Sequence, residues 1–392
     1  MLFLTGLVLI FLVQWLHLRL LRLELPSRYH RALPWILGLI HIPLILFAGL
    51  RLVGLGGHGA LPLLRGMARG GFYFQAFTVL HLLAGMAAEG LWRLRSRHKP
   101  EPPGEAVDPG RRAFLRTAAL ASTGAAAAFG VRGAREAYGD PEIARHTLPF
   151  ADLPPGLDGL RLAQLSDLHA GPLVGPELLR RWQDLAARER PDLLLVTGDL
   201  VDSRPDELGP FLEAFAGFPA TYGTFAVLGN HDYFDDPRPI WRDLEAAGIR
   251  CLENTSALVR RNGGSLAVMV LQDPMARNGR FRRMVFGPGP RPAEAVRDVP
   301  ADAFRLCLNH RPSEWDKALT AGARLTLSGH THGGQINLIP GVSSAYLLGP
   351  RTQGFYRQGE DLLYVSRGLG VVGLPLRIAA PPEIAIFTLK RA

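Results

Sequence analysis

The chain has 392 residues, of which 47% are hydrophobic and 20% are charged, and it contains two cysteines. This composition excludes a disordered chain, a collagen-like chain and a disulfide-rich scaffold, and the length allows two or so domains with buried cores. The net charge is +9, but residues 1–135 carry 16 basic and 5 acidic side chains while the remainder carries 28 and 30. A nucleic-acid-binding protein places its positive charge on the recognising domain, so we expect no nucleic-acid partner.

Three apolar stretches predict membrane-spanning helices within residues 1–98: Leu2–Leu18, Leu33–Leu50 and Gly71–Trp92. Each approaches the ~20 residues that a helix needs to cross a bilayer. Helices of a soluble bundle would have a polar stripe, and these stretches have hardly any polar residues. Ten basic residues follow the first and third stretches, against three in the intervening loop. This excess predicts that the segments after the first and third stretches are cytoplasmic. The three stretches together predict a protein that crosses the lipid bilayer several times.

Residues 99–135 are predicted to form a linker and a fourth apolar segment. The sequence from Gly110 to Arg116 resembles a twin-arginine export signal and precedes an Ala-rich run from Thr117 to Val131. Such a signal would make the twin-arginine export machinery a partner. A plain fourth span is the alternative, and both interpretations place the following residues on the extracytoplasmic face. A third interpretation, a linker helix, leaves them in the cytoplasm.

The remainder, residues 136–392, predicts an α/β domain, because short β-rich runs alternate with helical ones from Leu157 onward. The predicted strands are Leu160–Ser166, Leu193–Thr197, Thr224–Leu228, Ala257–Arg261, Leu266–Leu271, Arg305–Leu308, Leu325–Leu327, Leu362–Val365 and Ile384–Leu389. The predicted helices are Pro176–Arg188, Pro237–Ala247 and Ser313–Thr320. Cys307 lies in a predicted core strand and is therefore predicted to be a buried free thiol, with pairing to Cys251 in an oxidising compartment as the alternative.

Polar clusters follow five of the predicted strands, where open α/β sheets place their functional sites. They contain Asp167 and His169, Asp199, Asn230 to Asp232, His310, and His330 to His332. Each cluster alone has a plain structural explanation, such as a capping carboxylate, a core histidine or a glycine turn. Burying all of them without a cation would cost several kcal/mol. The set therefore predicts a metal centre, and its mixture of imidazole and oxygen donors suits Mn, Fe or Zn.

These ordered motifs resemble the calcineurin-like metallophosphoesterases, and most of all their bacterial membrane-associated or twin-arginine-exported branch. The resemblance covers roughly Leu157 to Leu389, and it includes Tyr364–Gly370 and Pro381–Glu383. It implies a four-layer α/β/β/α sandwich that follows the N-terminal transmembrane region. It also implies two divalent metal ions between the sheets and a location in the bacterial cell membrane.

The resemblance also implies a role for each site residue. Asp167, His169 and His332 would bind one metal, Asn230, His310 and His330 the other, and Asp199 would bridge both beside a hydroxide. His231 would give a proton to the leaving group. Asp232 either orients His231 or caps a turn, and the sequence does not decide between these. Arg311 is interpreted as a structural residue, with a phosphate clamp as the alternative.

The sequence thus favours a membrane-anchored, metal-dependent hydrolase of a phosphate ester or pyrophosphate. Its substrate would be a phosphorylated small molecule or a lipid, and the membrane tether favours a lipid-linked or envelope substrate. A non-catalytic metal-binding module that senses or relays a signal is the alternative. The basic stretch between Gln272 and Arg291 is interpreted as a solvated hairpin loop, with a lid or membrane contact as the sharper alternative.

Overall fold

The computed structural model describes residues 109–277, 285–337 and 342–392, and seven isolated residues nearer the N-terminus. The chain divides into two compact units, Met1–Arg135 and Glu136–Ala392. The three predicted spans and the segment 278–284 of the basic stretch lie outside the described residues, apart from a few isolated positions. The prediction of an N-terminal membrane region therefore stays a prediction.

The twin-arginine-like segment lies in helix α4 (Pro109–Tyr138), which contains the whole run from Thr117 to Val131. Among the helices that the structure describes, α4 included, none combines the length and apolarity of a membrane span. The interpretation of this run as a plain fourth span stays a prediction. Whether the segment is an export signal stays a prediction.

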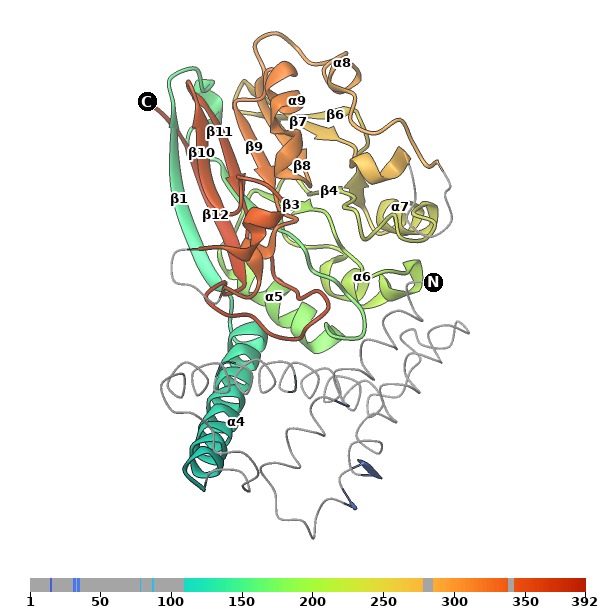
Figure 1. Ribbon diagram of the computed structural model, residues 1–392. Helices are drawn as coiled ribbons and strands as arrows, with labels where there is room; N and C mark the ends of the chain where they lie inside the picture. Colours follow the sequence, from blue (N-terminus) through green and yellow to red (C-terminus); the bar gives the residue numbers. More distant parts are fainter. Residues whose placement is uncertain are drawn as a thin grey trace. The chain divides into compact units, whose positions relative to one another are not determined.

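Two six-stranded mixed sheets form the framework of the described part of Glu136–Ala392 (Figure 1). The first has, in spatial order, β1 (Glu142–Phe150), β12 (Glu383–Arg391), β2 (Arg161–Leu165), β3 (Leu193–Thr197), β4 (Thr224–Val227) and β5 (Ile249–Cys251). The second has β10 (Gly354–Gln358), β11 (Asp361–Val365), β9 (Leu325–Ser328), β8 (Phe304–Asn309), β7 (Gly264–Leu271) and β6 (Ser256–Arg261). Strands β2 to β5 run parallel, and so do β7, β8, β9 and β11.

Three hydrophobic clusters hold the layers together, because successive residues of a strand face opposite sides of its sheet. Leu162 and Leu306 belong to the cluster that packs the sheets face to face. Ala163, next in sequence to Leu162, packs in the cluster of α5 (Pro176–Arg188), α6 (Gly209–Phe215) and α7 (Arg238–Ala246). Cys307, next to Leu306, packs in the cluster of α8 (Pro292–Ala295) and α9 (Trp315–Thr320). Helices thus cover the outer faces of both sheets.

The mixed α/β class with its strands and helices is confirmed, with differences at the sheet edges. All nine predicted strands are present within a few residues, and α5 has the predicted bounds. The strands β1, β5 and β10 were not predicted, nor were the helices α6 and α8. β1 and β10 are edge strands with many solvent-facing residues, so they lack the continuous apolar pattern of β3. Cys307 is a buried free thiol, as predicted, and Cys251 is also buried and free.

Candidate metal centre

The predicted site residues lie in loops at the carboxyl ends of parallel strands from both sheets. β2, β3 and β4 lead into the loops of Asp167, Asp199 and Asn230, while β8 and β9 lead into those of His310 and His330. The two sheets meet directly beneath these loops, where the Gln164 side-chain amide donates a 2.9 Å hydrogen bond to the Ser328 carbonyl. Because parallel strands end at one edge, the loops converge.

Backbone strain is concentrated in these loops. Five predicted site residues have a left-handed backbone, with φ of 52° at Asp167, 49° at His169, 53° at Asp199, 73° at His330 and 51° at His332. For a residue with a side chain this conformation costs on the order of 1–2 kcal/mol. Such strain persists where the surrounding structure enforces it, and it gathers at functional sites. The loops are therefore shaped to direct these side chains inward.

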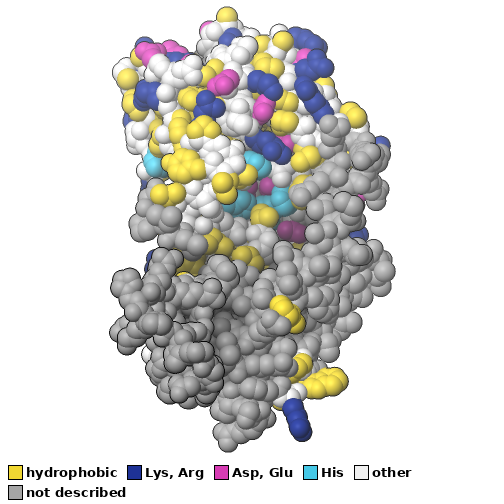
Figure 2. Space-filling model, in the orientation of Figure 1, with side chains coloured by type: hydrophobic (Ala, Val, Ile, Leu, Met, Phe, Trp, Pro, Cys, Tyr) yellow, Lys and Arg dark blue, Asp and Glu magenta, His cyan; other side chains and the backbone are white. Residues whose placement is uncertain are grey.

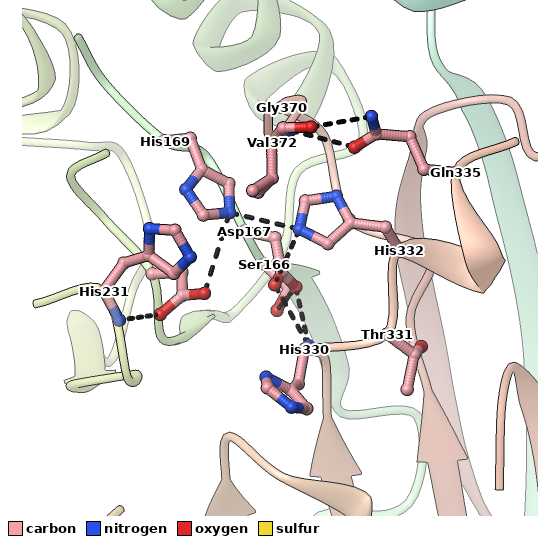
Figure 3. A network of polar contacts seen from close by, with 12 residues as sticks. Ser166, Asp167, His169, His231, His330, Thr331, His332, Gln335, Gly370 and Val372 are labelled. Carbon is pink, nitrogen blue, oxygen red and sulfur yellow. Dashed lines mark hydrogen bonds and ion pairs between the residues drawn. The ribbon is translucent and has the colours of Figure 1, made fainter. Parts of the chain in front are cut away.

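One group of donors contains Asp167, His169 and His332 (Figure 3). The Nε2 atoms of His169 and His332 lie 3.1 Å apart, and His332 Nε2 lies 3.4 Å from Asp167 Oδ1. The Asp167 carboxylate is held in place by the Ser166 hydroxyl, 2.6 Å away, and by the backbone N–H of His330 at 3.0 Å. All three side chains are buried, so their donor atoms face one another instead of water.

A second group adjoins the first through Asp199. Asp199 Oδ2 lies 3.3 Å from His310 Nε2 and 3.6 Å from His169 Nε2, which belongs to the first group. His310 Nε2 lies 3.1 Å from Asn230 Oδ1. His330 completes the group, because one donor atom each from Asp199, His310 and His330 lie within 4.8 Å of one another. The structure thus brings all seven predicted ligands into one region, with Asp199 between the two groups.

Glycines let the backbone approach this closely. A Cβ on Gly198 would lie 2.5 Å from His310 Nδ1, and one on Gly229 would overlap the Asp199 carboxylate. A Cβ on Gly329 would overlap the side chains of Ser166 and Asp167. Gly198 also has φ of 88°, a conformation that favours glycine. These glycines therefore serve the site as well as its turns.

Burial and neighbouring charges shift the pKa values of the cluster in opposite directions. Burial raises the pKa of Asp167 to about 6. Burial and the facing imidazoles hold the pKa of His169 and of His332 well below the ordinary value. Burial also acts to lower the pKa of His310, but the carboxylates of Asp199 and Asp167 outweigh it and raise that pKa to about 10. His169 and His332 are thus neutral at neutral pH, the form in which imidazole binds a metal.

Sequence comparisons bear directly on this arrangement. Residues 160–334 match the family model described as calcineurin-like phosphoesterase. The chain is 33% identical over 296 residues to a zebrafish (Danio rerio) protein named transmembrane protein with metallophosphoesterase domain, a match that covers 74% of this chain and 65% of that one. It is 31% identical over 297 residues to the uncharacterized metallophosphoesterase YkuE of Bacillus subtilis (strain 168), covering 71% of this chain and 97% of YkuE. The chain belongs to the calcineurin-like phosphoesterase family.

The family membership confirms the enzyme class predicted from the motifs, a metal-dependent phosphoesterase.

Among solved structures, a 5'-nucleotidase precursor from Thermus thermophilus matches with a TM-score of 0.39 and 17% identity, covering 58% of this chain and 54% of that one. The chain spans 65% of the length of the zebrafish relative.

The donor set of this phosphoesterase fits divalent metal ions. The buried Nε2 atoms of His169 and His332 lie 3.1 Å apart, close enough for one cation to contact both. His169 Nδ1 is also buried without a hydrogen-bond partner in the part of the chain that the structure describes. Nitrogen and oxygen donors in this mixture suit Mn, Fe or Zn, since Mg and Ca take oxygen almost alone.

His231 lies at the edge of the donor groups, and its side chain is half-buried in the lining of the pocket. Its backbone N–H donates to Asp199 Oδ1 at 2.8 Å, and its Nδ1 lies 2.5 Å from the Asp202 carbonyl oxygen. A carbonyl oxygen only accepts hydrogen bonds, so Nδ1 carries a hydrogen and Nε2 is the atom free to exchange a proton. The ring also packs against Phe234, with centroids 4.2 Å apart.

The interpretation that Asp232 orients His231 is not supported by the geometry. Its carboxylate accepts hydrogen bonds from the backbone N–H groups of Leu200, Val201 and Gly229, at 3.0, 3.1 and 2.8 Å. Burial, reinforced by the charge of Asp199, raises the pKa of Asp232 to about 7. Asp232 therefore fastens the loop after β3 to the loop after β4. The Asp202 carbonyl holds the imidazole instead.

Arg311 has the structural role that the sequence favoured. Its Nε donates to Asp273 Oδ2 at 2.8 Å, and the Asp273 side chain is buried. An arginine committed to a buried carboxylate fixes the loop after β8. The alternative, a phosphate clamp, is not favoured by this contact.

Sequence reasoning missed Arg377, whose fully buried guanidinium holds the C-terminal loop against the site. It donates to the carbonyls of Gly370, Arg367 and Ala380 at 2.6, 2.9 and 2.9 Å. Its Nη2 also lies 3.2 Å from His332 Nδ1. The guanidinium thus links His332, a metal-ligand candidate, to three backbone carbonyls of the loop after β11.

We expect Arg377→Met to lower the melting temperature of the full-length protein by about 6–12 °C, as a loss of roughly 3 kcal/mol implies. The reason is that methionine leaves several buried carbonyl oxygens without a donor. Arg351→Met serves as the control, because Arg351 pairs with Asp316, whose side chain is exposed. Thermal unfolding followed by circular dichroism measures both variants. Equal melting temperatures for Arg377→Met and wild type would contradict the assigned role.

Proposed function

We propose that this protein hydrolyses a phosphate ester or a pyrophosphate with a dinuclear metal centre, while its N-terminal region anchors it in the membrane. The observation that carries the proposal is the position of Asp199, whose Oδ2 lies within 3.6 Å of His169 Nε2 and 3.3 Å of His310 Nε2. One carboxylate between two groups of donors is suited to two cations.

The donors divide between the two ions according to their distances. Asp167, His169 and His332 would hold one ion, because their donor atoms lie within 4.8 Å of one another. His310 and His330 would hold the other with Asn230, whose amide oxygen lies 3.1 Å from His310 Nε2. Asp199 would be shared. When bound, a pair of divalent ions neutralises phosphoryl charge and makes water nucleophilic at neutral pH.

The chain's own residues would handle the proton. Hydrolysis breaks one P–O bond, adds the hydroxyl group of water to phosphorus and returns a proton to the leaving oxygen. His231 Nε2 is placed for that transfer, because the Asp202 carbonyl fixes the opposite ring nitrogen and the ring lines the pocket. General acid catalysis of this kind contributes about 10²–10⁴ in rate.

The membrane location remains part of the proposal. Three predicted spans precede the domain, and relatives from zebrafish and cattle (Bos taurus) are named transmembrane proteins. We propose that the catalytic domain lies on the extracytoplasmic face of a bacterial membrane, with the twin-arginine-like segment as its export signal. There it would act on a lipid-linked or envelope phosphate.

A hydrolysis assay with the full-length protein in detergent tests the proposed function. After loading with Mn²⁺, we expect turnover of 4-nitrophenyl phosphate or bis(4-nitrophenyl) phosphate, its loss on chelation, and its return on adding the metal. The relative rates on the two substrates would give the preference between monoesters and diesters. Metal binding without turnover of any phosphate ester would favour the alternative, a metal-binding sensory module.

A further inference from the structure

A short apolar segment follows the loop of His332, and its Leu348 lines the pocket that contains the metal-ligand candidates. Val342, Tyr346, Leu347 and Leu348 have exposed fractions of 49%, 57%, 92% and 59%. Folding normally removes such side chains from water, and a full burial of one leucine is worth about 1.5–3 kcal/mol. Single exposed leucines scattered over a surface are common, but these four side chains lie within seven residues. Such a cluster indicates an interaction surface. We call these four side chains the apolar rim.

The apolar rim is held in place by the loop that carries His332. The hydroxyl of Ser343 donates to the Gly333 carbonyl at 2.9 Å, and the hydroxyl of Ser344 donates to the Gly334 carbonyl. Asn337 Oδ1 accepts a 2.9 Å hydrogen bond from the backbone N–H of Ser344. A 3₁₀ turn, η7 (Ser344–Leu347), then follows with Ala345 buried beneath it. The exposure of Tyr346 and Leu347 is thus built into a fastened turn.

The same segment also forms one wall of the pocket. The pocket has a volume of about 260 Å³. Its lining includes the polar side chains of Asp199, His231 and His330, and Leu348 and Val372 contribute apolar surface. Figure 2 shows histidine side chains in a hollow of the surface with hydrophobic side chains beside them. A molecule whose phosphate reaches the histidines can therefore contact Leu348, and the exposed Tyr346 and Leu347 of η7 directly precede Leu348.

We infer that the apolar rim contacts the acyl chains of a membrane lipid whose phosphate lies at the metal-ligand candidates. This inference rests on the proposed function and names its substrate class, a lipid phosphate ester or pyrophosphate. A lipid matches both halves of the surface, since it joins an anionic group to hydrocarbon. The predicted spans in residues 1–98 would tether the chain to a bilayer, where such lipids are found. A soluble phosphate would leave Leu347 in water during catalysis.

A competition assay with matched inhibitors tests this inference. Glycerol 3-phosphate and dihexanoyl phosphatidic acid share a phosphate monoester and differ in acyl chains, and each competes with 4-nitrophenyl phosphate on the full-length protein. We expect the lipid to bind wild type at least tenfold more tightly than glycerol 3-phosphate. We expect Leu347→Ser, and separately Tyr346→Ser, to reduce this affinity ratio about tenfold, as loss of one buried apolar contact implies. Phe355→Ser is the matched control, because Phe355 is 41% exposed on the edge strand β10 and lies outside the pocket lining.

The ratio of the two inhibitor affinities is taken within each variant. A change in basal activity affects both measurements alike, so a change in the ratio reports on acyl-chain contact. A wild-type ratio near one, or a high ratio that both rim variants retain, would overturn the inference. The ligand-induced rise in melting temperature provides the same ratio without catalysis. If the protein binds phosphatidic acid in this way but hydrolyses no phosphate ester, the proposed function fails while the acyl-chain contact stands.

Discussion

Replacing Asp199 by asparagine should abolish phosphate ester hydrolysis, with a loss of kcat/KM beyond the ~10²–10³ that removal of one transition-state hydrogen bond costs. Asp199 faces His169 and His310 at 3.6 and 3.3 Å, so its carboxylate serves both donor groups. Asparagine preserves the size of the side chain and tolerates the left-handed backbone of this position, where φ is 53°. The change therefore tests the charge and leaves the loop in place.

The measurement compares Asp199→Asn with Asp316→Asn in Mn²⁺-loaded full-length protein. Asp316 is a surface residue paired with Arg351, so its substitution should leave kcat/KM near that of wild type. Circular dichroism spectra should be alike for both variants. An Asp199→Asn protein that keeps more than a tenth of wild-type activity would contradict a shared carboxylate at the centre.

Replacing His231 by asparagine should lower the hydrolysis of alkyl phosphates by about 10²–10⁴ while leaving the metal content unchanged. An asparagine side-chain amide can still donate to the Asp202 carbonyl, which lies 2.5 Å from His231 Nδ1 in the native protein. It lacks the Nε2 atom that would transfer the proton. The loss should be far smaller for 4-nitrophenyl esters, because 4-nitrophenolate leaves readily without protonation.

The dependence on the leaving group separates a proton donor from a metal ligand. His169, Asp199 and His231 also lie close enough together to hold an ion, so a ligand role for His231 makes a different prediction. In that case His231→Asn would lose metal and would slow alkyl and aryl substrates equally. His146→Asn is the matched control, since His146 packs against Phe355, Tyr364 and Phe387 outside the pocket lining.

The central strands and their terminal loops could be predicted from sequence because one physical rule connects them. A fully buried strand such as Leu193–Thr197 reads as an unbroken apolar run, and the polar residues after it must lie at its carboxyl end. Parallel neighbours share that end, so Asp167 and Asp199 had to approach each other once the sheet formed. The edge strands β1 and β10 lack such an apolar run because many of their side chains face solvent.

The roles of Asp232 and Arg377 could not be predicted, for a different reason. The sequence suggested that Asp232 either orients His231 or caps a turn, and it could not show that the carboxylate is directed to the backbone N–H groups of another loop. Arg377 looks like any other arginine until its three carbonyl acceptors are known. Side-chain direction in an irregular loop is determined by contacts from distant segments, which periodicity does not encode. The apolar rim was missed for the same reason, since its exposure depends on the turn at Ser343.

The number of divalent ions per chain tests the central claim most directly. Full-length protein loaded with Mn²⁺ and freed of unbound metal is analysed by inductively coupled plasma mass spectrometry, beside Asp199→Asn. We expect about two ions per wild-type chain, as a two-metal phosphoesterase site requires, and a clear loss in the variant. One ion or none in the wild type, or an unchanged content in Asp199→Asn, would contradict a pair of cations sharing that carboxylate.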